Sequence, residues 1–111
     1  PRLIGLQRAM GLAITGDKID AETAAQWGMI WKCIDDDALM DEVMEFARHI
    51  ATQPTRSIGL IKRALYASLG NDLDSQLDLE RNLQRVAGYG TDYREGVQAF
   101  LEKRPAKFTG A

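Results

Sequence analysis

Cysteine is nearly absent from this sequence, in which Cys33 is the only one among 111 residues. A single thiol can form no disulfide within the chain and cannot supply the paired cysteines of a zinc site. A reducing compartment, the cytoplasm, is therefore expected. No apolar run approaches the roughly 20 residues that span a bilayer, and no signal peptide precedes the first expected helix. The sequence predicts no membrane partner.

Histidine and phosphate-binding glycine loops are equally scarce. His49 is the only histidine, and its place beside Ile50 on an amphipathic segment favours a surface position over a catalytic triad. Neither GxGxxG nor GxxxxGK[ST] occurs, which excludes those two nucleotide-binding loops. The acidic run 35–37 lacks the ligand spacing of a calcium loop, and helix capping accounts for it. No metal site is predicted.

Charge is close to balanced, with 14 basic and 16 acidic residues and a net charge of −2. This balance argues against generic nucleic-acid binding, which requires a basic face. Hydrophobic residues make up 45% and charged residues 27%, as in ordinary folded domains. The sequence starts at Pro1 without an initiator methionine, so further sequence upstream is expected.

Apolar residues recur at helical spacing in several segments, each flanked by capping residues, glycine or proline. The bulky run Met29–Ile34 is short enough to form an extended, strand-like segment. The fold class expected is mainly α, with about six helices and one short strand. The helices are expected at about 1–16, 20–28, 39–50, 54–70, 73–88 and 91–104.

A basic, aromatic segment forms the end of the last expected helix and continues beyond it. Lys103, Arg104 and Lys107 suit phosphate groups, and Phe100 or Phe108 offers a flat surface to a base. Helix C-termini also attract cations in general, so the pattern alone does not require a ligand.

Trp27 and Trp31 lie four residues apart around Gly28. They could line an aromatic pocket, or they could anchor the short helix and strand to the rest of the protein. Both interpretations stay open at this point.

Two stretches resemble the crotonase (enoyl-CoA hydratase/isomerase) superfamily. "LAITGDKIDAETAAQWGMIWKCI" is similar to its helix, Thr-Gly turn, Ile-x-Ala and Gly-Leu-Val pattern, and "DYREGVQAFLEKRPAKFTG" is similar to its C-terminal signature. The resemblance covers essentially the whole chain. It implies that residues 1–111 are the C-terminal helical region of an α/β crotonase-type fold, which supports trimer formation and closes the acyl-CoA pocket. The catalytic N-terminal region would then be absent from this sequence.

The resemblance also implies a function. "WGMIWKCIDD", "ATQPTRSIGLIKRAL" and "LDLERNLQR" look most like the bacterial phenylacetate-pathway isomerases, which convert the ring epoxide of phenylacetyl-CoA to an oxepin. The alternatives are an enoyl-CoA hydratase of fatty-acid β-oxidation and a non-catalytic helical assembly module. The substrate would be a coenzyme A thioester with no covalently bound cofactor, and the assembly a homotrimer or a dimer of trimers.

Site residues implied by the resemblance are few. Lys103 matches a family lysine that reaches the adenosine phosphate region of coenzyme A in an adjacent subunit. Trp27 and Trp31 are possible acyl-pocket aromatics. An aromatic residue that touches the adenine in hydratases matches Gln84 here, so this contact is not carried over. The oxyanion-hole N–H groups and the catalytic carboxylate lie upstream in the family, so no catalytic residue is expected in this segment.

Overall fold

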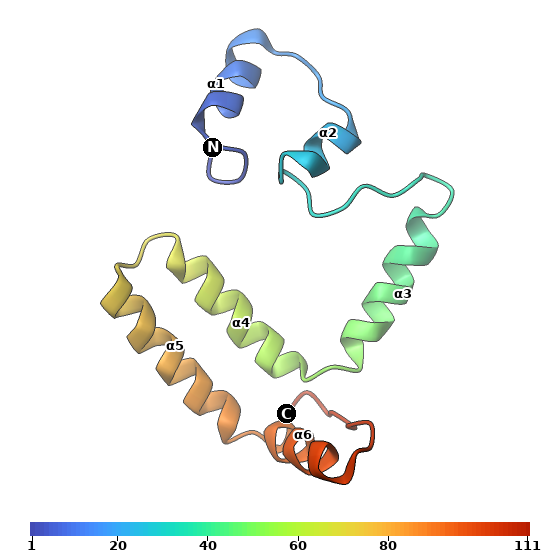
Figure 1. Ribbon diagram of the computed structural model, residues 1–111, viewed down its shortest axis with the longest axis vertical. Helices are drawn as coiled ribbons and strands as arrows, with labels where there is room; N and C mark the ends of the chain where they lie inside the picture. Colours follow the sequence, from blue (N-terminus) through green and yellow to red (C-terminus); the bar gives the residue numbers. More distant parts are fainter. The chain divides into compact units, whose positions relative to one another are not determined.

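A computed structural model describes residues 1–111 and contains six helices and no strand (Figure 1). The chain forms two compact units, Pro1–Glu42 and Val43–Ala111, with the boundary inside the third helix. The mainly α prediction and the number of helices are confirmed. The helices are α1 (Leu6–Thr15), α2 (Ala21–Gln26), α3 (Leu39–Ala51), α4 (Thr55–Ser68), α5 (Leu73–Gly88) and α6 (Thr91–Glu102).

The predicted strand at Met29–Ile34 is wrong. The N–H groups of Met29 and Ile30 donate instead to the carbonyl of Ala24 in α2, over 2.9 and 3.4 Å. A strand satisfies its backbone groups through a neighbouring strand, and the structure contains none. The β-propensity of these side chains is therefore not enough to make this segment a strand.

The first helix begins later than its apolar spacing predicts. Gly5 has φ 81°, outside the helical region, and its N–H donates to the Pro1 carbonyl over 2.9 Å. Residues 1–5 therefore form a turn, and Leu3 precedes α1.

Two later helix starts follow their capping residues. The Asp20 carboxylate accepts from the Thr23 N–H over 2.7 Å, and the Asp72 carboxylate accepts from the Ser75 N–H over 2.8 Å. Each bond satisfies one of the free N–H groups that open a helix, so local side-chain chemistry fixes where α2 and α5 begin.

The unit 1–42 contains α1 and α2 and has a small core. Ala24 is its buried hydrophobic residue, and the Arg8 guanidinium lies 5.0 Å from the ring centroid of Trp27. Lys32 and Glu42 form an exposed ion pair. The cation–π contact shows that Trp27 connects α2 to α1.

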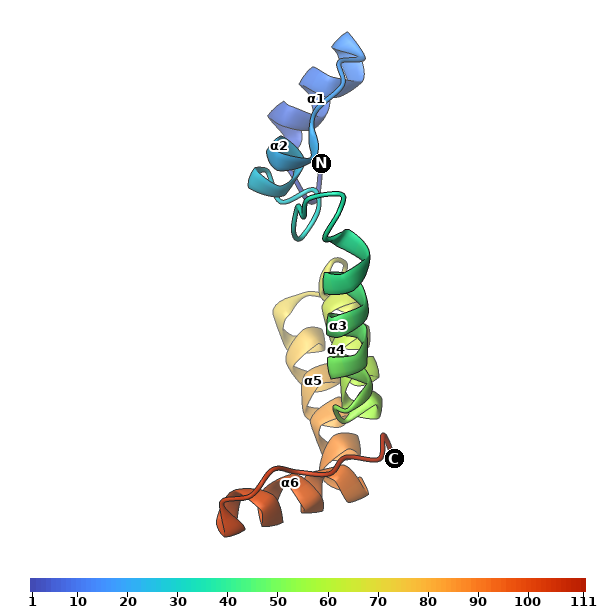
Figure 2. The same cartoon turned by 90° about the vertical axis from the view of Figure 1, so that its right-hand side faces the viewer.

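The unit 43–111 contains a helical hairpin of α4 and α5, which lie side by side in Figures 1 and 2. The Gln76 side-chain amide donates to the Ala64 carbonyl over 3.2 Å and joins the two helices. Leu83 is the buried hydrophobic residue of α5. After Tyr89 the chain changes direction into α6, and the last residues return along α6 (Figure 2).

None of the six helices combines the length and the apolar character that a membrane span requires.

Candidate functional site

The last residues, Arg104–Ala111, form a tail that is attached to α6 by two carboxylates. The first is Glu95, whose Oε1 and Oε2 accept from Nη1 and Nη2 of Arg104 over 2.6 and 3.0 Å. Glu95 Oε1 also accepts from the Lys107 backbone N–H over 2.7 Å. These bonds, those of Arg104 foremost, lower the pKa of Glu95 to about 2, and the carboxylates of Glu95 and Glu102 raise the pKa of Arg104. Both groups are therefore charged at neutral pH.

The second carboxylate is Asp92, which is only 5% exposed. Its Oδ1 accepts from the Thr109 backbone N–H over 2.7 Å and from the Thr109 hydroxyl over 3.1 Å. Its Oδ2 accepts from the Gly110 N–H over 2.8 Å. The bond from the Thr109 N–H is the main reason that the pKa of Asp92 is lowered. We call Asp92, Glu95 and their partners in the tail the clasp.

Lys103 connects α6 to the tail and has an unusual backbone. It is the one non-glycine residue with positive φ, at 54°. The Lys103 N–H donates to the Phe100 carbonyl over 3.2 Å, and the Arg104 N–H donates to the Ala99 carbonyl over 3.0 Å, the two bonds of a Schellman motif. Glycine usually occupies this position, because a side chain in left-handed geometry costs roughly 1–2 kcal/mol.

The Lys103 side chain is exposed and takes part in none of the ion pairs of the structure. The guanidinium of its neighbour Arg104 differs, because Glu95 and Glu102 both bind it. Of the two adjacent cations, only Lys103 keeps its charge available to a ligand. The guanidinium of Arg104 is less available to a phosphate than the Lys103 ammonium, and its use for phosphate binding stays a prediction.

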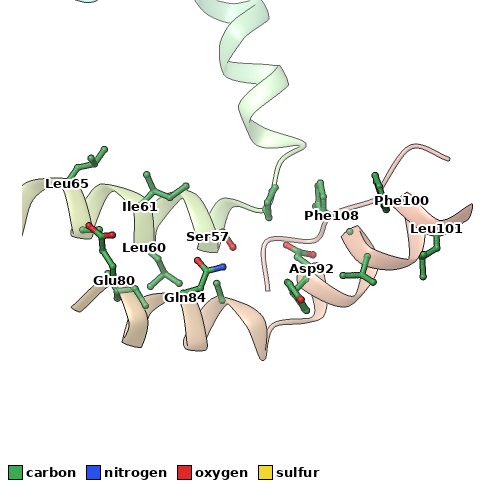
Figure 3. A pocket seen from close by; sticks show the side chains of 17 residues that line it. Ser57, Leu60, Ile61, Leu65, Glu80, Gln84, Asp92, Phe100, Leu101 and Phe108 are labelled. Carbon is green, nitrogen blue, oxygen red and sulfur yellow. The ribbon is translucent and has the colours of Figure 1, made fainter. Parts of the chain in front are cut away.

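A groove of about 750 Å³ lies between α4, α5, α6 and the tail (Figure 3). Its wall includes exposed apolar side chains such as Ile61, Leu65 and Leu101, together with Phe100, which is 82% exposed. The ring of Phe108 packs against α6 at Gly96, where an added Cβ would lie 3.5 Å from it. The groove is therefore mainly apolar along α4 and α6.

The polar groups of the groove come mainly from α5 and from the start of α6. Figure 3 shows Glu80 and Gln84 on α5 and Asp92 on α6. Gln84, the position where the resemblance suggests an aromatic residue in hydratases, thus lines the groove with an amide. Phe108, one of the two predicted base-stacking rings, is half-buried here.

The other residues considered in the sequence are Trp27, Trp31 and His49. Trp27 is half-buried beneath Arg8, whereas Trp31 is 82% exposed in the segment that follows α2. His49 lies on the exposed surface of α3, as predicted. Both tryptophans belong to the unit 1–42, and their role in an acyl pocket stays a prediction.

Sequence reasoning did not identify Asp92 and Glu95 as ligands of the tail. Their positions in the first turns of α6 favour an interaction with the helix dipole, and that interpretation uses no distant partner. A signal was nevertheless present, because two acids three residues apart on one helix face precede a basic segment that Pro105 forces out of the helix.

The whole chain matches a known family. The sequence profile described as "Enoyl-CoA hydratase/isomerase" matches residues 1–111. The chain belongs to the enoyl-CoA hydratase/isomerase family. A crystal structure of an enoyl-CoA hydratase from Geobacillus kaustophilus superposes with a TM-score of 0.95 at 31% identity, over 99% of this chain and 42% of that one. The helical arrangement of this family member is therefore that of a part of the crotonase fold.

Two relatives are more similar in sequence. The 1,2-epoxyphenylacetyl-CoA isomerase of Escherichia coli is 56% identical over 110 residues, which are 99% of this chain and 42% of the relative. A Rhodobacter capsulatus protein with the name "Probable enoyl-CoA hydratase" is 46% identical over 110 residues, 99% of this chain and 43% of the relative. The chain thus spans less than half the length of these curated relatives.

Proposed function

We propose that residues 1–111 are part of an acyl-CoA isomerase that converts ring-epoxidised phenylacetyl-CoA to an oxepin through a thioester enolate. The observation that supports this best is the 56% identity to the E. coli 1,2-epoxyphenylacetyl-CoA isomerase over 99% of the chain. The second candidate is an enoyl-CoA hydratase of fatty-acid β-oxidation. The 46% identity to the R. capsulatus protein favours it.

In this proposal residues 1–111 are the C-terminal helical region, and the catalytic groups belong to another part of the polypeptide. Enolate chemistry requires two N–H donors directed at the thioester oxygen and a carboxylate that moves protons. The helical region supports the trimer and closes the acyl pocket, to which Trp27 and Trp31 contribute aromatic surface. The single free thiol, Cys33, is compatible with a reducing cytoplasm.

The apolar groove is the surface that we assign to the neighbouring subunit of a homotrimer, alone or in a dimer of trimers. Phe100 and Leu101 on α6 and Leu65 on α4 are all more than half exposed on its wall. Exposed apolar side chains gathered along one groove are typical of an interface, because leaving them in water is unfavourable. Aromatic anchors beside aliphatic side chains are also typical of the centre of an interface.

Lys103 is the residue that we assign to coenzyme A, where its ammonium binds the adenosine phosphate region as a point charge. Its exposure and its lack of a carboxylate partner support this assignment, as does its place in the C-terminal signature.

Activity on two substrates tests the reaction. The natural polypeptide that carries residues 1–111 is incubated with 1,2-epoxyphenylacetyl-CoA and, separately, with crotonyl-CoA. We expect isomerisation of the epoxide to give the higher kcat/KM. Hydration of crotonyl-CoA without action on the epoxide would support the hydratase, and no action on either thioester would support a non-catalytic assembly module.

Coenzyme A affinity tests the ligand contact. Loss of a charge-assisted hydrogen bond by Lys103→Ala is expected to raise the Kd for coenzyme A by about tenfold, measured by isothermal titration calorimetry. Lys107→Ala removes an equal charge four residues away and serves as the matched control, for which a smaller change is expected. An unchanged Kd in Lys103→Ala would contradict the assignment.

A further inference from the structure

The left-handed residue and the clasp are consecutive in the chain. Lys103 is the one non-glycine residue with positive φ, and the next residue, Arg104, makes the bidentate bonds to Glu95. A non-glycine residue keeps such a backbone only where its surroundings hold it, and such residues cluster at functional sites. In this protein the bonds of Arg104 hold the backbone of Lys103.

Lys103 is fixed on both sides. On one side, α6 holds it through the bond from its own N–H to the Phe100 carbonyl. On the other side, Arg104 is held twice, since its N–H donates to the Ala99 carbonyl and its guanidinium to Glu95. Pro105 then restricts the backbone further, because its ring fixes φ. The Lys103 side chain itself is exposed and takes part in no ion pair.

We propose that Glu95 is a positioning residue for coenzyme A binding, which holds the Arg104 side of the Lys103 backbone so that the Lys103 ammonium points toward the phosphates of the ligand. This inference rests on the proposed contact between Lys103 and coenzyme A. Glu95 itself touches no ligand atom in this account. Its bond to the Lys107 N–H extends the same support beyond Pro105.

The ion pair has a second consequence for an anionic ligand. Glu102 precedes Lys103 directly, Glu95 contacts its neighbour Arg104, and both carboxylates would repel phosphates if they were unpaired. Arg104 binds both carboxylates, with its Nη1 2.6 Å from Glu95 Oε1 and its Nε 2.6 Å from Glu102 Oε2. The positive charge of Arg104 therefore offsets part of the negative charge of the two acids while leaving Lys103 unpaired.

A double-mutant cycle on the natural polypeptide separates positioning from a general structural role. The variants are Lys103→Ala, Glu95→Gln and the double substitution, with the Kd for coenzyme A measured by calorimetry. We expect Glu95→Gln alone to raise the Kd by about threefold or more, and to have no further effect once Lys103 is alanine. Asp78→Asn is the control, because it removes an exposed ion pair with Arg81 on α5 outside the clasp.

Each outcome decides one point. If Glu95→Gln weakens binding equally in both backgrounds, Glu95 supports the fold and not Lys103, and the inference is wrong. If only Lys103→Ala weakens binding, the inference fails while the ligand contact stands. If Lys103→Ala has no effect, the proposed contact itself fails.

A second variant covers the case in which Glu95→Gln does not fold, as judged by circular dichroism. Arg104→Lys keeps the positive charge but cannot form the two parallel bonds to Glu95. It is expected to raise the Kd in the same direction, again only when Lys103 is present. An unchanged Kd in this variant would overturn the proposal.

Discussion

At the scale of single residues, Lys103 combines an unfavourable backbone with an available charge. Lys103→Gly relieves the crowding of a left-handed side chain, although glycine also loses more entropy on folding. We expect the free energy of unfolding to stay the same or to rise by up to about 1 kcal/mol, while affinity for coenzyme A falls. Urea denaturation and calorimetry measure the two effects, and a clear loss of stability would argue against the left-handed backbone.

Gly110 is a position in the clasp that requires glycine. It has φ 78°, and an added Cβ would lie 2.4 Å from the Thr55 hydroxyl oxygen at the start of α4. Gly110→Ala is expected to lower the free energy of unfolding by about 1–2 kcal/mol through strain and crowding.

The matched control for Gly110→Ala is Gly59→Ala, the same chemical change inside α4, where an added Cβ meets nothing within 4 Å. This control should raise stability by roughly 0.5–1 kcal/mol, because alanine is the better helix former. Thermal denaturation compares the two, and equal shifts would contradict the described path of the tail.

At the scale of elements, the attachment of the tail to α6 depends on pH in a defined direction. The pKa of Glu95 is lowered from 4.5 to about 2 in the folded protein. A lowered pKa means that the ionised group stabilises the fold above about pH 4.5, and that this contribution is lost as pH falls toward 2. The stability difference between the wild type and Glu95→Gln should therefore be constant from pH 8 to about 5 and shrink below it. A difference that persists unchanged to pH 2.5 would show that the charge is not responsible.

The helices were predictable because their information is local. Apolar spacing places α3 to α5, and Asp20 and Asp72 start their helices as capping residues do. The errors share another cause. Residues 29–34 have strand-like side chains, but a strand also requires a partner that the structure lacks. The start of α1 depends on the turn at Gly5, which apolar spacing does not report.

The site was less predictable than the helices because its bonds join residues that are far apart in the sequence. The resemblance identifies Lys103 by matching positions, without any knowledge of its backbone. The bonds from Asp92 to Thr109 and Gly110 join residues 17 and 18 apart. They exist because the tail reverses after Pro105, and no local pattern in the first turns of α6 predicts that reversal.

At the scale of the whole molecule, the groove predicts an effect on assembly. Phe100→Arg puts a charge on the apolar wall where we place the neighbouring subunit, so the oligomer of the natural polypeptide should dissociate, as measured by light scattering after size-exclusion chromatography. Helical content should not change, because Phe100 is 82% exposed. Tyr66→Arg is the control, since Tyr66 is an exposed aromatic residue of α4 outside the groove. If both variants keep the parental mass, the groove is not the subunit interface.

The clasp also bears on how the protein is made. A ribosome synthesises α6 before the tail, so the acceptors Asp92 and Glu95 exist in the nascent chain before any of their donors. A chain interrupted just before Thr109 already contains all six helices, yet it lacks every bond that Asp92 makes to the tail. Translation must pass Gly110 before the tail can be attached at both ends. The bonds of Glu95 need only Arg104 and Lys107, so the backbone of Lys103 can be held before the tail is attached through Asp92, and the two attachments form in a fixed order during synthesis.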